Sequence, residues 1–233
     1  MARPSSTGAS ENGFRSIVLL SGDIEQRNLA LILKQFNPRL KVVPVGTEAQ
    51  LTAVSPALLA RSRLLAFSTP VVVPAAVLHQ LGYGAYNFHP GSPDYPGWHP
   101  VSFALYDRAK VFGATAHLMA EQVDAGPIVD LELFEVEPGT TAEQLSEAAY
   151  AAAVRLFWRL AEPLATRSEP LPTLSLGWSG RKSSRRSFAR QCEIPLDIPA
   201  EELARRVAAF GLGDGRSAPT VTLHGFRFRL VQD

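Results

Sequence analysis

Short apolar runs alternate with amphipathic stretches along the first two thirds of the chain. Each run consists mostly of apolar residues and is bounded by small or polar residues, which is typical of buried strands. The predicted strands are residues 16–20, 40–45, 64–67 and 85–88. The segments between them predict helices over 23–36, 48–51 and 74–82 and a turn over 58–61. We expect Asp23 to cap the first helix and Gly82 to end the last.

The alternation continues beyond these segments. The predicted elements are a loop rich in proline and glycine over 89–98, a helix over 100–106, strands over 113–120 and 128–134, and a long helix ending near residue 160. A capping box is expected at the start of the long helix, formed by Thr140 with Glu143 or by Thr141 with Gln144. Strands that alternate with helices predict the α/β class, with a Rossmann-like, mostly parallel sheet flanked by helices over 15–165.

The composition changes after Pro163. Residues 166–190 are rich in proline, serine, glycine and arginine, so we expect a basic linker over 166–193 rather than a core element. The remainder, 194–233, predicts a small truncated α+β module. Its expected elements are a short strand over 194–196, a helix over 199–210 and a β-hairpin made by 220–223 and 226–231.

The hairpin alternates apolar with basic residues. We expect its apolar residues to pack on the preceding amphipathic helix, and a spare apolar face would instead indicate a homodimer contact. The residues concerned are Phe226, Phe228 and Leu230 on the hairpin and Leu203, Val207 and Phe210 on the helix.

Composition excludes several classes of protein. The chain has 233 residues, of which 46% are hydrophobic, enough for a packed core, and its net charge of +1 does not favour nucleic acid or a membrane surface as a partner. The single cysteine, Cys192, cannot form an internal disulfide and fits a reducing, cytoplasmic compartment. No apolar run approaches the ~20 residues of a membrane span. The polar residues 1–14 lack a secretory signal and are expected to form a flexible tail.

Three polar side chains occur where predicted strands end. Asn87 and His89 are two residues apart, so on an extended backbone they point to the same side. They follow a strand of an open α/β sheet, where binding sites form, and Asp124 occupies a second turn that could reach them. An amide donor, a titratable ring and a carboxylate are the groups needed for moving an acyl group between nucleophiles.

Structural alternatives exist for each of these residues. A single histidine at a strand end is more often structural than catalytic, and Asp124-Ala125-Gly126 is also the composition of an ordinary turn. His117 on its strand is expected to be packed and hydrogen-bonded rather than catalytic. A metal site would draw on His89, His99, His117, Asp94 and Asp124, but no pair has the spacing of a zinc motif, so we expect no metal.

Four motifs in order carry a resemblance to a known family. They are Asn87-Phe88-His89-Pro90, Tyr95-Pro96-Gly97, the segment GATAH at 113–117 and the segment VDAGPI at 123–128. In order and spacing they resemble the folate-dependent formyltransferases, which include glycinamide ribonucleotide transformylase, methionyl-tRNA formyltransferase and the sugar N-formyltransferases. The resemblance runs from about residue 16 to 164, and the C-terminal module looks like the opening part of the family's small C-terminal domain.

The resemblance implies an N-formyltransferase that uses 10-formyltetrahydrofolate as co-substrate and a small-molecule amine as acceptor. It assigns catalysis to Asn87 and His89, which would stabilise an oxyanion, and to Asp124, which would orient His89 and assist proton removal. Supporting positions are His117 and Thr115. The residues expected to bind the folate are Phe67, Val71, Val72, Val73, Val123 and Asp124.

Two departures from the family pattern bear on the substrates. The loop after the first strand carries Asp23 and Glu25 where the purine enzyme has a glycine-rich phosphate cradle, which argues against glycinamide ribonucleotide as acceptor. The loop 68–74 before the catalytic strand is also changed. The basic segment 181–190 is expected to be a solvated connector, with an acidic acceptor or a partner subunit as alternatives. Formyltetrahydrofolate hydrolysis and non-catalytic folate or ligand binding remain alternative functions.

Overall fold

The computed structural model of the chain describes residues 13–179, 181–211 and 218–231. Its strands are β1 (Ser16–Leu20), β2 (Lys41–Val45), β3 (Ser62–Phe67), β4 (Ala85–His89), β5 (Val111–Leu118), β6 (Ile128–Glu135), β7 (Thr220–Leu223) and β8 (Phe226–Arg229). Its helices are α1 (Asp23–Phe36), α2 (Glu48–Thr52), α3 (Pro56–Leu59), α4 (Ala75–Leu78), α5 (Pro100–Tyr106), α6 (Ala142–Thr166), α7 (Arg185–Cys192) and α8 (Ala200–Phe210).

The predicted fold class is confirmed. The strands form a six-stranded, mostly parallel sheet in the order β2-β1-β3-β4-β5-β6 and a two-stranded antiparallel sheet of β7 and β8. The residues cluster into two units, one of Met1–Asn87 with Trp158–Pro172 and one of Phe88–Phe157 with Thr173–Asp233. Strand β4 and helix α6 each contribute residues to both units. No helix in the described parts of the chain is long and apolar enough to cross a membrane.

Strand β1 is the centre of the first unit. All five of its residues are buried, and it pairs in parallel with β2 on one side and β3 on the other, which explains its continuous apolar sequence. Helix α1 begins at Asp23, but its N-cap is Gly22, so the predicted cap at Asp23 is wrong. Asp23 and Glu25 instead lie in the first turn, where their charges complement the helix dipole. Helix α4 is also shorter than predicted, since it ends at Leu78 before Gly82.

One charged side chain lies in the core of this unit. Arg63 on β3 is fully buried, and its guanidinium donates hydrogen bonds to the carbonyl oxygens of Tyr83 at 3.2 Å, Leu164 at 2.6 Å and Glu169 at 3.1 Å. It also lies 5.4 Å from the centre of the Tyr86 ring. Because helix carbonyls near the C-terminus lack intrahelical partners, Arg63 caps the end of α6 and holds the segment that follows it.

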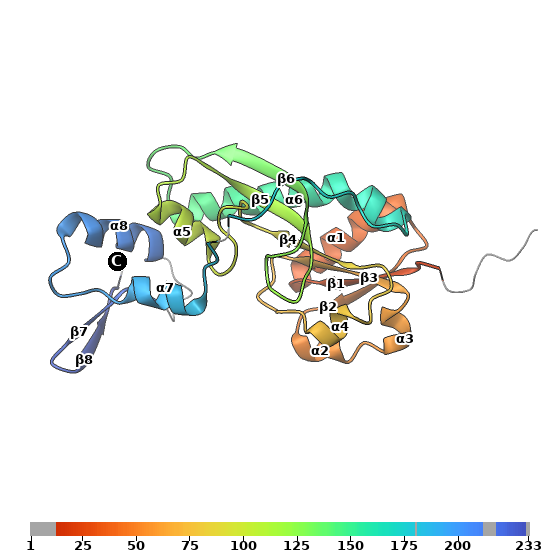
Figure 1. The fold of residues 1–233 in the computed structure, drawn as a ribbon, viewed down its shortest axis with the longest axis horizontal. Helices are drawn as coiled ribbons and strands as arrows, with labels where there is room; N and C mark the ends of the chain where they lie inside the picture. Colours follow the sequence, from red (N-terminus) through yellow and green to blue (C-terminus); the bar gives the residue numbers. More distant parts are fainter. Residues whose placement is uncertain (1–12, 180, 212–217, 232–233) are drawn as a thin grey trace, which may run out of the picture. The chain divides into compact units, whose positions relative to one another are not determined.

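The second unit is built on β5 and β6, which pair as an antiparallel ribbon (Figure 1). Phe112 on β5 packs with Leu145 and Ala149 of α6 in one buried cluster. Gly113 is required on β5, because a Cβ atom there would collide with the backbone of Glu132 on β6. At the start of α6, Thr141 and Gln144 exchange side-chain and backbone hydrogen bonds, so the second of the two predicted capping boxes is the one formed.

The C-terminal segment differs from its prediction in two of its elements. The expected linker 166–193 contains helix α7, whose Phe188 and Cys192 are buried against Phe210 of α8, because apolar residues four apart share one helix face. The expected strand over 194–196 is absent: Ile194 makes a single backbone hydrogen bond to Thr220, and Pro195 has no N–H to continue the ladder. Helix α8 and the hairpin form as predicted.

The hairpin does not pack on α8 as expected. It extends away from α7 and α8 (Figure 1), and Phe226 and Phe228 are 71% and 56% exposed. His224 and Gly225 both have positive φ, as a tight two-residue hairpin turn requires. The register pairs Leu223 with Phe226 and Val221 with Phe228, so one face is apolar; Val221 is half-buried and the other three residues are exposed. The structure thus agrees with the second of the two arrangements considered from the sequence, in which the hairpin keeps an apolar face that does not pack on α8.

Candidate active site

Strand β4 delivers two of the predicted residues. Phe88 is fully buried and its ring packs 4.9 Å from that of Phe157, and side chains alternate along a strand, so Asn87 and His89 share the opposite side. Asn87 is half-buried, whereas His89, the last residue of β4, is only 6% exposed. Nε2 of the His89 ring lies 3.1 Å from the carbonyl oxygen of Tyr95 in the loop that follows.

The loop after β4 turns back against the histidine. Gly91 donates its N–H to the carbonyl oxygen of His89 at 2.9 Å, and a Cβ atom at residue 91 would lie 2.9 Å from Cδ2 of His89. Only glycine therefore leaves the ring in place. Thr115 on β5 is fully buried and donates its hydroxyl to the Gly91 carbonyl oxygen at 2.7 Å. This hydrogen bond of Thr115 therefore fixes the loop after β4 and does not involve the His89 ring.

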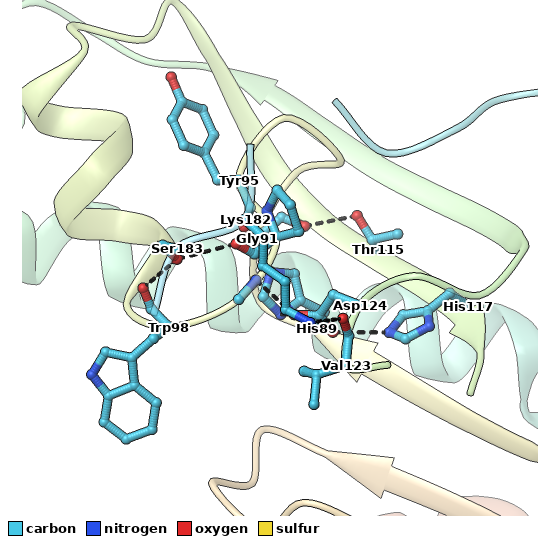
Figure 2. Close-up of polar contacts among 12 residues, drawn as sticks. His89, Gly91, Tyr95, Trp98, Thr115, His117, Val123, Asp124, Lys182 and Ser183 are labelled. Carbon is cyan, nitrogen blue, oxygen red and sulfur yellow. Dashed lines mark hydrogen bonds and ion pairs between the residues drawn. The ribbon is translucent and has the colours of Figure 1, made fainter. Parts of the chain in front are cut away.

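Asp124 meets both histidines. Its Oδ2 atom accepts the N–H of Gly97 at 2.8 Å and lies 3.5 Å from Nδ1 of His89. Its Oδ1 atom lies 3.2 Å from Nε2 of His117, and Figure 2 shows the carboxylate between the two rings. Asp124 has φ of 46°, a left-handed conformation that Asp tolerates better than most residues. The carboxylate is 6% exposed, so the structure brings His89, His117 and Asp124 together in a buried cluster.

The turn that carries Asp124 is fixed by close backbone packing. A Cβ atom at Gly126 would collide with the carbonyl oxygen of Leu118, so only glycine lets the turn approach the end of β5. The ladder between β5 and β6 shifts register between Ala116 and His117, and bulges of this kind re-aim a side chain. His117 is therefore part of the cluster, a closer involvement than the packed strand residue expected from the sequence.

The electrostatics of the cluster differ between the aspartate and its partner histidine. Burial by itself raises the pKa of Asp124, but the His89 and His117 rings and the Gly97 N–H outweigh it, so the pKa lies well below the ordinary value and Asp124 is ionised. Burial lowers the pKa of His89, opposed by the Asp124 charge and the Tyr95 carbonyl and aided by His117, which favours a neutral ring near pH 7.

His117 has acceptors at both ring nitrogens. Nδ1 lies 2.8 Å from the Leu118 carbonyl oxygen, which can only accept, so Nδ1 carries a proton. Nε2 lies 3.2 Å from Oδ1 of Asp124, so both nitrogens of His117 face acceptor oxygens, as both nitrogens of His89 face Tyr95 and Asp124.

Residues of the expected linker contact the same loops. Lys182 donates from Nζ to the Val123 carbonyl oxygen, and Ser183 donates from Oγ to the Trp98 carbonyl oxygen at 2.6 Å (Figure 2). Trp178 donates its indole N–H to the Gly126 carbonyl oxygen at 2.9 Å. Sequence reasoning missed these residues and the Gly97 N–H. A lone tryptophan in a polar, glycine- and serine-rich segment was the one available signal.

The other residues predicted to bind the folate lie at several places in the structure. Phe67 ends β3 and is fully buried, and its carbonyl oxygen accepts the Ser21 hydroxyl at 2.7 Å. Val71, Val72 and Val73 lie between β3 and α4, and Val72 is 59% exposed. Val123 precedes Asp124 and is 39% exposed.

The two other residues considered as metal ligands have different surroundings. His99 is the N-cap of α5 with φ of 53°, and its ring packs 4.4 Å from that of Phe188. Asp94 is exposed. Across residues 13–179, 181–211 and 218–231, no group of three or more histidine, cysteine or acidic side chains has an arrangement that could hold a metal ion.

Comparisons with known proteins point to one family. Residues 64–160 match the family described as formyl transferase. A methionyl-tRNA formyltransferase of Thermotoga maritima is 27% identical over 141 residues, which cover 58% of this chain and 43% of the relative. The chain thus spans less than half the length of that curated relative.

Two solved structures share the fold over nearly the whole chain. A sugar N-formyltransferase from a Shewanella species superposes with a TM-score of 0.76 at 15% identity, covering 93% of this chain and 96% of that one. An N-formyltransferase from Helicobacter canadensis, in complex with folinic acid and dTDP-3-aminofucose, superposes with a TM-score of 0.64 at 13% identity, covering 91% and 85%.

Proposed function

We propose that this chain, whose residues 64–160 match the formyl transferase family, is an N-formyltransferase that carries a formyl group from 10-formyltetrahydrofolate to an amine. The observation that carries the proposal is the buried cluster at the end of β4, in which Asp124 lies 3.5 Å from His89 and 3.2 Å from His117. All three residues fall inside the matched segment, and Asn87 precedes His89 by two positions on the same strand.

The co-substrate supplies a formyl carbon, and attack by an amine turns its carbonyl oxygen into an oxyanion. In this proposal the Asn87 amide N–H donates to that oxygen, as does the Nε2–H of His89 after it turns from the Tyr95 carbonyl, and one such donor lowers the barrier by about 3–4 kcal/mol. Asp124, held ionised, orients the His89 ring and stabilises positive charge on it when it takes up a proton. The proton lost by the amine passes toward this cluster directly or through water, and the leaving nitrogen of the folate regains one.

The apolar residues predicted to bind the folate fit it in chemical character. A flat, largely apolar ring system needs apolar side chains that reach solvent, and Val123 beside Asp124 and Val72 in the changed loop are both partly exposed. We propose Phe67, Val71, Val72, Val73, Val123 and Asp124 as the folate-binding positions. The buried Cys192, present as a thiol, fits a reducing compartment such as the cytoplasm.

For the acceptor we propose an amino-sugar nucleotide as the first candidate. Structures alike over more than 90% of this chain include a sugar N-formyltransferase and an N-formyltransferase complexed with dTDP-3-aminofucose. Asp23 and Glu25 in the first turn of α1 would repel a phosphate there, which argues against glycinamide ribonucleotide. Methionyl-tRNA is a second candidate because a curated relative is a methionyl-tRNA formyltransferase.

The test is an assay that separates transfer from hydrolysis. The full chain is incubated with 10-formyltetrahydrofolate and each amine, and both formylated amine and free formate are measured. We expect amine-dependent release of tetrahydrofolate with little free formate, abolished in Asn87→Ala and His89→Ala. His79→Ala, at an exposed histidine after α4, is the matched control and should keep full activity. Formate release without any amine would support the hydrolase instead, and folate binding without turnover would support the non-catalytic alternative.

We also propose that the chain forms a homodimer through the hairpin. The face made by Val221, Leu223, Phe226 and Phe228 is apolar and the opposite face carries Arg227 and Arg229. A two-stranded hairpin alone is at best marginally stable in water, so covering the apolar face with a second hairpin would stabilise both. Sedimentation of wild type and of Phe226→Ser with Phe228→Ser should give a dimer and a monomer. Equal masses for the two proteins would refute this contact.

A further inference from the structure

Residues 173–179 and 181–184, here called the strap, run along both loops that form the cluster. At the start of the strap, Leu174 donates its N–H to the Ile128 carbonyl oxygen at 2.7 Å, beyond the Asp124 turn. In its middle, Ser179 donates its N–H to the Pro93 carbonyl oxygen at 3.0 Å. At its end, Ser183 exchanges backbone hydrogen bonds with Pro96 and Trp98 at 2.9 and 3.3 Å. A segment that sequence alone marked as a connector is therefore bonded to the loops of the cluster.

Trp178 is the one aromatic residue of the strap, and it reaches the two histidines. The centre of its ring lies 4.9 Å from that of His117 at an interplanar angle of 88°, and 5.9 Å from that of His89 at 72°. Both are edge-to-face contacts, a preferred arrangement of aromatic rings that contributes about 0.5–1.5 kcal/mol each. The indole N–H donates to Gly126, so Trp178 is itself fixed to the turn that carries Asp124.

We propose that Trp178 is a positioning residue for the His89–Asp124–His117 cluster, holding both imidazole rings against the carboxylate and keeping water from the rings. The expected effect of Trp178 on turnover rests on the proposed formyl transfer, whereas its expected effect on the position of the histidine rings does not. The contacts of Trp178 and of the strap are with the histidine rings and the loops, not with reacting atoms. The proposed role of Trp178 is therefore to orient the rings. A tryptophan suits it because one side chain provides an apolar face and a hydrogen-bond donor.

Removal of the indole has a definite electrostatic consequence. Three groups face His89: Asp124 from the turn before β6, His117 from β5 and the Tyr95 carbonyl from the loop after β4. The strap presents Trp178 and, beyond Val123, the Lys182 ammonium. Burial is the main reason that the pKa of His89 is lowered. Water admitted by removing the indole weakens this effect while Asp124 stays, so the pKa of His89 rises.

The experiment follows the two rings in the full chain without any substrate. Histidine side chains labelled with ¹³C and ¹⁵N are titrated by NMR in wild type, Trp178→Ala and Trp178→Phe. We expect the His89 titration to move to higher pH in Trp178→Ala and by a smaller amount in Trp178→Phe, which keeps a ring but loses the indole N–H. Trp158→Ala, at a half-exposed tryptophan of α6 in the other unit, is the matched control and should leave the titration unchanged.

Kinetics supply the second readout. With a productive amine, Trp178→Ala should lower kcat by on the order of tenfold with little change in KM for the amine, because the catalytic groups are misplaced while the groups that bind the acceptor stay in place. A His89 titration unchanged in Trp178→Ala overturns the proposal, even if thermal stability falls. If Trp178→Ala does not fold, Trp178→Leu carries the same expectations with most of the apolar volume kept. If wild type transfers no formyl group to any amine, the proposed function fails while the titration still decides the role of Trp178.

Discussion

Replacing Gly91 with alanine tests the position of the His89 ring directly. A Cβ atom at residue 91 would lie 2.9 Å from Cδ2 of His89, closer still to Nε2, and 2.9 Å from Cβ of Pro100. Ordinary van der Waals contact begins at 3.4 Å, so the ring has to retreat by about 0.5–1 Å. Pro100 opens α5 and is held by the helix, so the imidazole is the group that gives way.

The expected cost falls on activity more than on stability. A displacement of this size in a catalytic group lowers turnover by roughly 10- to 100-fold. Overpacking of one methyl group lowers the free energy of unfolding by about 1–3 kcal/mol. Gly91 does not have a positive φ, so the methyl group adds crowding without backbone strain. The two quantities are separated by measuring kcat for formyl transfer and urea-induced unfolding on the same preparations.

Gly13→Ala is the matched control, because a Cβ atom there has nothing within 4 Å and Gly13 also lacks a positive φ. It should keep wild-type kcat. NMR signals of the His89 ring should shift in Gly91→Ala and stay in place in the control. A Gly91→Ala protein with unchanged kcat and unshifted His89 signals would refute the reasoning, since it would mean that catalysis uses a different position of the ring.

Four further predictions concern charge. Asp124→Asn should lower kcat by two orders of magnitude or more. The free energy of unfolding should fall by less than about 2 kcal/mol, because the amide oxygen of asparagine still accepts the Gly97 N–H. A large drop in thermal stability with a modest loss of kcat would mark a structural aspartate. The acid limb of kcat should lie below pH 6.5, because the pKa of His89 is lowered from that value and its neutral form persists to lower pH; a limb above 6.5 in wild type would contradict this. The free energy of unfolding measured in urea should fall as pH drops below 6.5, because native His89 binds fewer protons than unfolded His89. It should fall again in more acid solution, where Asp124 is protonated and its contribution to stability is lost. Arg63→Met should lower the free energy of unfolding by about 3 kcal/mol or more, because it leaves buried carbonyl oxygens at the end of α6 without a donor, whereas Arg39→Met at an exposed position should cost less than about 0.5 kcal/mol.

Local patterns predicted most of the secondary structure because they report local physics. The apolar run of β1 forms a strand buried on both faces, and the Thr141–Gln144 capping box forms at the start of α6. The turn at His224 and Gly225 likewise joins β7 to β8. Each of these depends on residues within a few positions of one another, so spacing alone carries the information. The local predictions that failed were the cap at Asp23 and the end of α4, and the long-range ones that failed used composition or pattern to judge packing.

The segment 166–193 shows why composition misleads. Its charge and its proline and glycine content predict a solvated segment. That prediction overlooked Phe188 and Cys192, which are four residues apart and bury one face of α7. Ser183 and Trp178 contact loops more than 50 residues away in sequence. The hairpin is the converse case, because pattern alone would assign its apolar face to the core, whereas Leu223, Phe226 and Phe228 are exposed.

The sequence by itself determined the order of strands and helices up to about residue 165, the class of fold and the three side chains that the motifs mark, Asn87, His89 and Asp124. Tertiary structure alone decided that Asp124 lies between two histidines, that the Gly97 N–H holds it and that Trp178 covers the rings. The physical reason is that periodicity and capping depend on neighbours along the chain, whereas burial, hydrogen bonds between loops and the resulting pKa shifts depend on segments that meet only when the chain has folded.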